Sequence, residues 1–127
     1  CQLNANGHSL IADEPISMGG SNLGPSPYDF LGSALASCTA MTLNMYARHK
    51  KIDLHNVDVS VEHSRIHADD CSDCEKTEGK VDVFHRRITL TGNLSSEQEA
   101  RMLHIADRCP VHKTLENEIK ITTELDL

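Results

Sequence analysis

Residues 26–49 read SPYDFLGSALASCTAMTLNMYARH, and this stretch decides the fold because it predicts one long helix with a defined start. Ser26 can cap a helix, Pro27 suits the first helical position, and Asp29 lies three residues after the cap. Apolar residues then recur at steps of three and four, which marks one face of a helix. They are Leu31, Ala34, Leu35, Cys38, Met41, Thr42 and Met45. Small residues flank Cys38, so other elements can approach closely and we expect the helix to be central.

Alternating residues on either side of this helix predict strands. His8–Ala12 predicts a short strand after a turn, and residues 57–67 alternate between valine and polar side chains as a half-buried strand does. Residues 69–74 form a polar tip, and residues 80–91 predict the return strand. The apolar residues of that return strand change phase, which indicates a bulge near His85.

A second helix and a last strand complete the predicted fold. Ser95 and Gln98 form a capping box at the start of the helix, and Pro110 ends it. Apolar residues alternate over 119–125, which predicts a strand. Residues 1–127 therefore predict one α+β domain in which a mainly antiparallel sheet packs against a long central helix and a second helix.

Composition and charge exclude some classes of function. The net charge of −7 argues against nucleic acid as a partner, and no apolar run is long enough for a membrane span. Only 39% of residues are hydrophobic, with two Phe, two Tyr and no Trp, so we expect additional burial through oligomerisation. Five irregularly spaced cysteines do not fit a secreted disulfide scaffold and favour a reducing, cytoplasmic location.

Cys38 and Cys109 are the candidate reactive residues. Cys38 lies in the middle of the apolar stripe, where it needs a nearby positive charge or hydrogen-bond donors to be active. Cys109 is expected at the C-terminus of the second helix, where the helix dipole disfavours a thiolate. This asymmetry suits Cys38 as the attacking thiol and Cys109 as the resolving one. Two ordinary buried thiols are the alternative, since free cysteine is often buried.

Three segments resemble the OsmC/Ohr family of thiol peroxidases, and the similarity covers nearly the whole chain. They are Gly24-Pro25-Ser26-Pro27-Tyr28-Asp29-Phe30-Leu31, Ala36-Ser37-Cys38-Thr39-Ala40-Met41-Thr42 and Cys109-Pro110-Val111-His112. Residues 46–48 and 63–68 resemble the less-characterised OsmC-like branch of that family.

The resemblance implies an OsmC-like fold in an intertwined homodimer, with the long helices at its centre and the active sites at the subunit interface. It implies that Cys38 is the peroxidatic cysteine and Cys109 the resolving one. The implied reaction, part of the defence against oxidative stress, reduces an organic hydroperoxide to its alcohol and forms a Cys38–Cys109 disulfide. A small or protein-bound dithiol then reduces the disulfide, and no cofactor is needed.

Two departures from the family pattern concern the residues around the thiols. The best-studied members carry a Glu directly after the proline that matches Pro27, where this chain has Tyr28 followed by Asp29. They also use an arginine from an N-terminal hairpin, and here no arginine precedes Arg48. We expect either that this hairpin is missing or that the site is built differently. The candidate supporting residues are Tyr28, Asp29, Arg108 and His112, of which Asp29 can also act simply as a helix cap.

Cys71-x-x-Cys74 offers a further candidate site. Together with His67 it resembles half of a zinc site, which needs four ligands. His63 could be the fourth, on the same strand face as His67. A metal site, a surface dithiol and no special role all remain open for this pair.

The sequence is therefore compatible with three functions. The first is the peroxidase, and the second is a non-catalytic thiol redox sensor or small-molecule-binding dimer with the same fold. The third is a metal-binding protein that uses Cys71 and Cys74.

Overall fold

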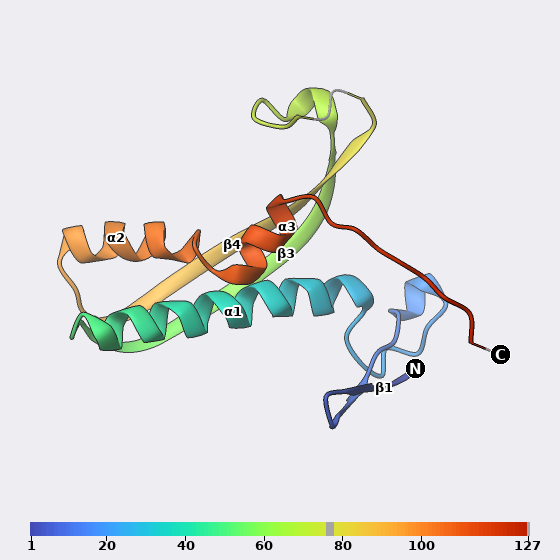
Figure 1. Cartoon of the computed structure of the whole chain (residues 1–127), viewed down its shortest axis with the longest axis horizontal. Helices are drawn as coiled ribbons and strands as arrows, with labels where there is room; N and C mark the ends of the chain where they lie inside the picture. The colour runs from blue at the N-terminus through green and yellow to red at the C-terminus, as the bar shows by residue number, and fades with distance from the viewer. Residues whose placement is uncertain (76–77, 127) are drawn as a thin grey trace. The chain divides into compact units, whose positions relative to one another are not determined.

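The structure is a computed structural model that describes residues 1–75 and 78–126 (Figure 1). Its elements follow in the order β1 (Gln2–Ala5), β2 (His8–Ile11), η1 (Ile16–Met18), α1 (Pro27–His49), β3 (Asp53–His67), η2 (Ala68–Asp70), β4 (Lys80–Asn93), α2 (Ser96–Ala106) and α3 (Pro110–Glu116). The predicted α+β class is confirmed, with antiparallel sheets and one long helix. Two compact units divide the chain: Cys1–Ala36 with Ser60–Arg87, and Ser37–Val59 with Ile88–Leu127.

Helix α1 begins where its capping residues predict. The Ser26 hydroxyl accepts a hydrogen bond from the Asp29 amide at 3.2 Å, and the Asp29 carboxylate accepts one from the Ser26 amide at 3.0 Å. Pro27 occupies the first helical position. Within the described residues, neither α1 nor any other helix combines the length and apolar character that a membrane span requires.

The buried face of α1 differs from the predicted stripe. Leu35, Thr39, Leu43 and Ala47 are buried at spacings of four residues. Other members of the predicted stripe are exposed: Leu31 at 42%, Met41 at 67% and Met45 at 67%. Small or apolar residues cover most of the surface of α1, so their spacing did not distinguish the buried face from the exposed face beside it. The predicted stripe therefore contains residues from both faces.

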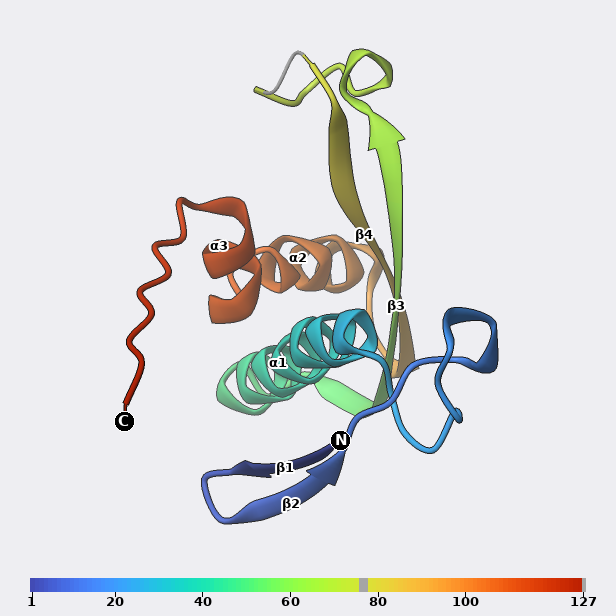
Figure 2. The same ribbon diagram turned by 90° about the vertical axis from the view of Figure 1, so that its right-hand side faces the viewer.

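In the first unit, β1 and β2 form an antiparallel hairpin (Figure 2). Asn6 and Gly7 both have positive φ, at 51° and 84°, as a tight two-residue hairpin turn requires. Gln2 pairs with Ile11 at the open end of the hairpin. The strand predicted at residues 8–12 is therefore confirmed to within one residue.

Strands β3 and β4 are hydrogen-bonded neighbours and form the long predicted hairpin. The strand predicted at 57–67 begins earlier, at Asp53. Alternate residues along both strands are half-buried, and the alternation changes phase at Val83 and Phe84, close to the predicted position of His85.

The second unit contains a small apolar core. Its buried members are Leu43, Ala47, Met102, Ile105 and Ala106. They come from the second half of α1 and from α2, which lie side by side in Figure 1. Helix α2 starts at the predicted capping box of Ser95 and Gln98.

The chain after α2 differs from the prediction. Helix α2 ends at Ala106 rather than at Cys109, and Pro110 opens α3. Proline cannot continue a helix, but its fixed φ suits the first position of a new one. The strand predicted at 119–125 is not formed, and Ile121 and Leu125 are 84% and 83% exposed. Their alternation is typical of a strand, but this segment has no strand partner within the described chain.

Candidate active site

Cys38 and Cys109 are free thiols in contact with each other. Cys38 lies on α1, Cys109 directly precedes α3, and both belong to the second unit. A hydrogen bond joins their two side chains. Cys109 is fully buried, whereas Cys38 is half-buried and therefore the more accessible of the two. The fold thus brings together the two thiols that the sequence singled out.

Cys109 is the N-cap of α3, which corrects its predicted place at the C-terminus of a helix. Its sulfur accepts a hydrogen bond from the His112 amide at 3.4 Å and another from the Thr39 hydroxyl at 3.8 Å. At the start of a helix the unpaired amides and the dipole favour negative charge. The site of Cys109 therefore stabilises a thiolate, in contrast to the prediction.

The surroundings shift the pKa values of the two thiols in opposite directions. Burial raises the pKa of Cys38, and its contact with Cys109 adds to the rise. Burial alone would also raise the pKa of Cys109, but hydrogen bonds from the His112 amide and the Cys38 thiol outweigh burial and lower it. The pair therefore loses a proton from Cys109 more readily than from Cys38.

The Val111 amide interacts with both sulfur atoms. It lowers the pKa of Cys38 and that of Cys109, against the effect of burial in each case. One backbone N–H can thus stabilise negative charge on whichever thiol is ionised. A proton can therefore move between Cys38 and Cys109, because the Val111 amide remains a hydrogen-bond donor to the sulfur that becomes negatively charged.

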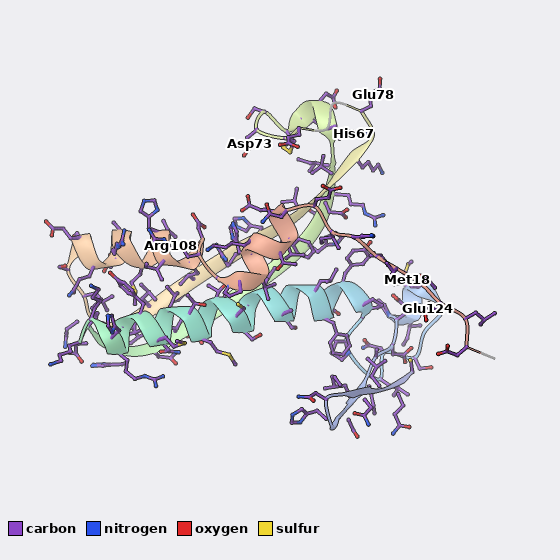
Figure 3. The ribbon with its side chains drawn as sticks, in the orientation of Figure 1. Met18, His67, Asp73, Glu78, Arg108 and Glu124 are labelled. Carbon is purple, nitrogen blue, oxygen red and sulfur yellow. A yellow bond between two sulfur atoms is a disulfide. The ribbon has the colours of Figure 1, made fainter. Side chains whose placement is uncertain are left out.

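The predicted supporting residues of this unit act differently from expectation. The His112 side chain lies 4.0 Å from an Asp107 carboxylate oxygen and contacts Glu116, so it reaches Cys109 only through its backbone amide. Arg108 is exposed on the linker between α2 and α3 (Figure 3). The positive character around Cys109 therefore comes from backbone amides.

The other two predicted supporting residues lie in the first unit. Asp29 is the capping carboxylate of α1 described above. The Tyr28 hydroxyl accepts a hydrogen bond from Arg65 Nη2 at 2.5 Å, and the Tyr28 ring stacks on His63 with ring centres 4.2 Å apart.

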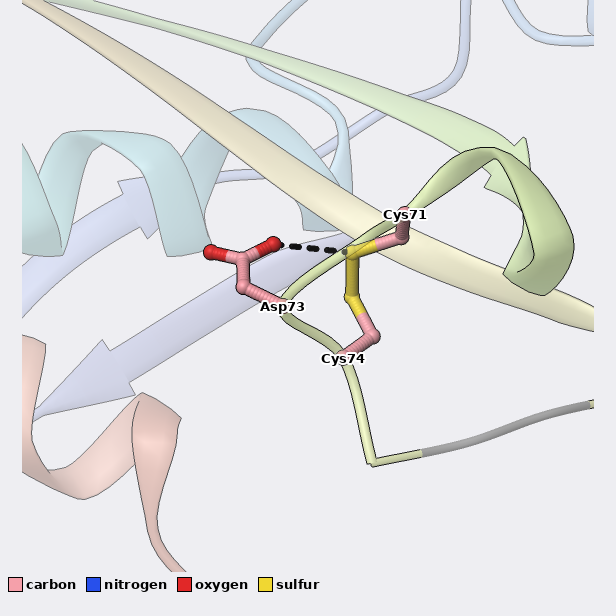
Figure 4. Close-up of a disulfide and its surroundings, with 3 residues drawn as sticks. All are labelled: Cys71, Asp73 and Cys74. Carbon is pink, nitrogen blue, oxygen red and sulfur yellow. Dashed lines mark hydrogen bonds between the residues drawn. A yellow bond between two sulfur atoms is a disulfide. The ribbon is translucent and has the colours of Figure 1, made fainter.

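Cys71 and Cys74 form a disulfide at the tip of the β3–β4 hairpin (Figure 4). In the described part of the chain, the ligand atoms close enough to share a metal ion belong to Cys71, Asp73 and Cys74, within 4.8 Å of one another. His67 lies outside this group, although the sequence suggested it as a ligand. Because the sulfurs are bonded to each other, they offer no thiolate ligands in this state.

Comparison with known proteins identifies the family. The sequence profile of the family described as "OsmC-like protein" matches residues 19–124. The chain belongs to the OsmC-like protein family. No curated protein matches the chain.

Solved structures share this OsmC-like fold. A Psychrobacter arcticus protein assigned to the osmotic-stress-induced and detoxification response is 25% identical, with a TM-score of 0.67 over 85% of this chain and 72% of that one. An OsmC-like protein from Mycoplasma pneumoniae is 24% identical, with a TM-score of 0.62 over 91% and 77%. A Vibrio cholerae protein assigned to organic hydroperoxide resistance is 19% identical, with a TM-score of 0.61 over 86% and 70%. Captopril occupies one of its active sites.

Arg65 contacts a predicted supporting residue of this OsmC-like chain but was not itself predicted as a site residue. Besides Tyr28, it contacts an Asp82 carboxylate oxygen through Nε at 2.9 Å, and His63 lies 2.8 Å from the same oxygen. Arg65 and the hydrogen bond from His63 lower the pKa of Asp82. The predicted supporting residue Tyr28 is thus held by an arginine. The alternation of β3 puts His63 and Arg65 on one face, and this could have been recognised from the sequence. Their partners could not, because these depend on the register of β4.

Proposed function

We propose that the protein is a cysteine-based peroxidase that reduces organic hydroperoxides to alcohols through Cys38 and Cys109. The observation that carries this proposal is the hydrogen bond between two free thiols, one accessible and one buried, beside backbone amides. The substrate class is supported by the likeness to proteins named for organic hydroperoxide resistance.

In the first step Cys38 is the nucleophile because it is the accessible thiol. Its proton passes to the Cys109 thiolate, and the Val111 amide then stabilises the new Cys38 thiolate. The thiolate attacks the terminal peroxide oxygen, so an S–O bond forms and the O–O bond breaks. The departing alkoxide takes the proton from Cys109 and leaves as the alcohol. Cys38 is oxidised by two electrons to a sulfenic acid, and Cys109 is again a thiolate.

In the second step the Cys109 thiolate attacks the sulfur of the Cys38 sulfenic acid. The S–S bond forms, the S–O bond breaks, and the hydroxide is protonated to water. The lowered pKa of Cys109 supports this role, because it raises the share of the resolving thiol that is present as the thiolate. An external dithiol then reduces the disulfide through thiol–disulfide exchange.

The direct test is to mix the purified protein with cumene hydroperoxide and a dithiol and to follow the loss of peroxide. Sustained turnover is expected for the natural sequence, and no turnover for Cys38→Ser. A Cys38→Ser protein that consumes peroxide at the original rate would contradict the proposal.

A thiol redox sensor is the second candidate, and the raised pKa of Cys38 favours it. A thiol that holds its proton reacts slowly with peroxide, because the thiolate is the nucleophile. The same assay separates the two functions, since a sensor consumes about one equivalent of peroxide and then stops even when dithiol is present.

We also propose that the protein acts as a homodimer. Met41 and Met45 are each 67% exposed on the same side of α1, and Leu103 on α2 is 65% exposed. Exposed methionine and leucine side chains on a helix are typical of a surface that a partner covers. A stable monomer in sedimentation experiments at low micromolar concentration would contradict this proposal.

A further inference from the structure

The Cys71–Cys74 disulfide is a redox group that the proposed peroxidase does not use. It joins residues three apart, with their Cα atoms 5.5 Å from each other, at the tip of the β3–β4 hairpin (Figure 4). Both cysteines are half-buried, so reagents in solvent can reach their sulfurs. We propose that this pair is a second thiol–disulfide exchange site, independent of Cys38 and Cys109, whose co-substrate is a dithiol that carries no net negative charge.

The disulfide contributes little to holding the fold together. A cross-link restricts the unfolded chain more as the loop that it closes becomes longer, and this loop is very short. Backbone hydrogen bonds already close the hairpin outside the disulfide, including the bond from the Ala68 amide to the Gly79 carbonyl at 2.9 Å. A disulfide that is accessible and structurally dispensable is of the kind that exchanges with external thiols.

Negative charge predominates around the pair. Residues 69–80 carry five acidic side chains against two lysines, Lys76 and Lys80, and all five are exposed: Asp69, Asp70, Asp73, Glu75 and Glu78. Glu78 lies on the same tip, as Figure 3 shows for Glu78 and Asp73. An Asp73 carboxylate oxygen is 3.2 Å from the Cys71 sulfur. Such a field repels an anionic thiol and attracts a cationic one over the range of the Debye length.

Asp73 also distinguishes the two sulfurs. The thiolate of the reductant attacks Cys74, whose sulfur is the one not in contact with the carboxylate, and forms a mixed disulfide. The Cys71–Cys74 bond breaks, and Cys71 leaves, takes a proton and donates a hydrogen bond to Asp73. The second thiol of the reductant then attacks the reductant sulfur that is bonded to Cys74. The reductant closes into a ring, and Cys74 is released as a thiol. The reductant loses two electrons and two protons as it becomes a cyclic disulfide, and Cys71 and Cys74 gain them.

The test compares the reduction rates of the pair by three dithiols of different charge: the cationic dithiobutylamine, the neutral dithiothreitol and the anionic dimercaptopropane sulfonate. Alkylation at timed intervals, followed by peptide mass spectrometry, reads Cys71 and Cys74 separately from the other cysteines. Each rate is divided by the rate of the same dithiol with hydroxyethyl disulfide, which is neutral and corrects for intrinsic reactivity. We expect the cationic reagent to exceed the anionic one by roughly tenfold at low salt, and the ratio to fall towards one at high salt.

Two variants, each of which loses one negative charge, make the test more specific. Asp73→Asn should reduce the preference for the cationic dithiol and raise the rate of the anionic one. Glu62→Gln, which removes an exposed carboxylate from the body of β3, is the matched control and should leave the preference unchanged. Cys38→Ser should change none of these rates, because the exchange site is independent of the proposed peroxidase.

Three results would overturn the proposal. One is a pair that stays oxidised under reductants that fully reduce hydroxyethyl disulfide. Another is a corrected rate that does not depend on the charge of the dithiol. The third is a clear fall in the urea midpoint when the pair is reduced, because that would make the disulfide a structural cross-link. An unchanged midpoint with charge-dependent rates supports the exchange site.

Discussion

The Thr39 hydroxyl donates a hydrogen bond to the sulfur of Cys109 at 3.8 Å across 70 residues of sequence. Both residues are fully buried, so the bond forms away from water. Thr39 follows Cys38 on α1, and the same turn of helix therefore carries the accessible thiol and a donor to the buried one. The bond helps to keep negative charge on Cys109, which the proposed mechanism requires of the resolving thiol.

Thr39→Val should slow the formation of the Cys38–Cys109 disulfide. Valine has nearly the same shape but no donor, so the pKa of Cys109 should rise and less thiolate should be present at neutral pH. A long hydrogen bond of this kind contributes about 0.5–1 kcal/mol, which corresponds to a rate lowered roughly two- to fivefold. Quenched-flow alkylation after one equivalent of peroxide measures the rate. Thr39→Ser keeps the hydroxyl and should preserve it; equal slowing in both variants would point to packing instead.

Cys109→Ser should lower the pKa of Cys38. Contact with Cys109 adds to the rise that burial causes, whereas the Val111 amide opposes that rise and remains in the variant. The thiolate of Cys38 should therefore be present at lower pH, and the curve of alkylation rate against pH should move to lower pH. Iodoacetamide labelling with peptide mass spectrometry records that curve. A shift to higher pH would show that Cys109 stabilises the Cys38 thiolate rather than the thiol.

Local signals in the sequence predicted the starts of both main helices. The caps of α1 and α2 involve residues three apart, so Ser26 with Asp29 and Ser95 with Gln98 could be recognised without any knowledge of the fold. Alternation predicted the β3–β4 hairpin for the same reason, because its period is a property of each strand alone.

Features that depend on distant partners could not be predicted in this way. Pro110 is equally suited to follow one helix or to begin another, so the sequence did not reveal Cys109 as an N-cap. The contact of Tyr28 with Arg65 depends on how a strand is placed against a helix start. The alternation near Ile121 is typical of a strand, but pairing needs a neighbouring strand, which local sequence does not identify.

Ser95→Ala should destabilise the protein without altering the thiols. The Ser95 hydroxyl accepts a hydrogen bond from the Gln98 amide at 3.1 Å, and the Gln98 side chain accepts one from the Ser95 amide at 2.9 Å. Loss of such a cap lowers the free energy of unfolding by about 1 kcal/mol. Urea denaturation followed by circular dichroism measures the change. Ser96→Ala, one residue later, is the control and should have little effect.

Met41→Lys should weaken the proposed homodimer. A charge placed on an apolar surface must be desolvated when a second copy covers it, so the dissociation constant should rise by more than tenfold. Analytical ultracentrifugation over a concentration series measures it. Leu23→Lys is the matched control, because Leu23 is 74% exposed in a loop. Equal dissociation constants for Met41→Lys and the natural sequence would place the interface elsewhere.

Cys109→Ser should still allow peroxide to oxidise Cys38, because the lower pKa expected for Cys38 in this variant supplies its thiolate without Cys109 as the base, and it should prevent resolution. The sulfenic acid forms on the attacking sulfur, and without a neighbouring thiol it persists or is oxidised further to sulfinic acid. Mass spectrometry after one equivalent of peroxide should find one or two added oxygen atoms on the peptide that contains Cys38. Cys71→Ser and Cys74→Ser should form the Cys38–Cys109 disulfide as the natural sequence does, since their pair is a separate redox group. If peroxide instead oxidises Cys109 first in the natural protein while Cys38 stays reduced, the lowered pKa of Cys109 outweighs its burial, and the two roles must be exchanged.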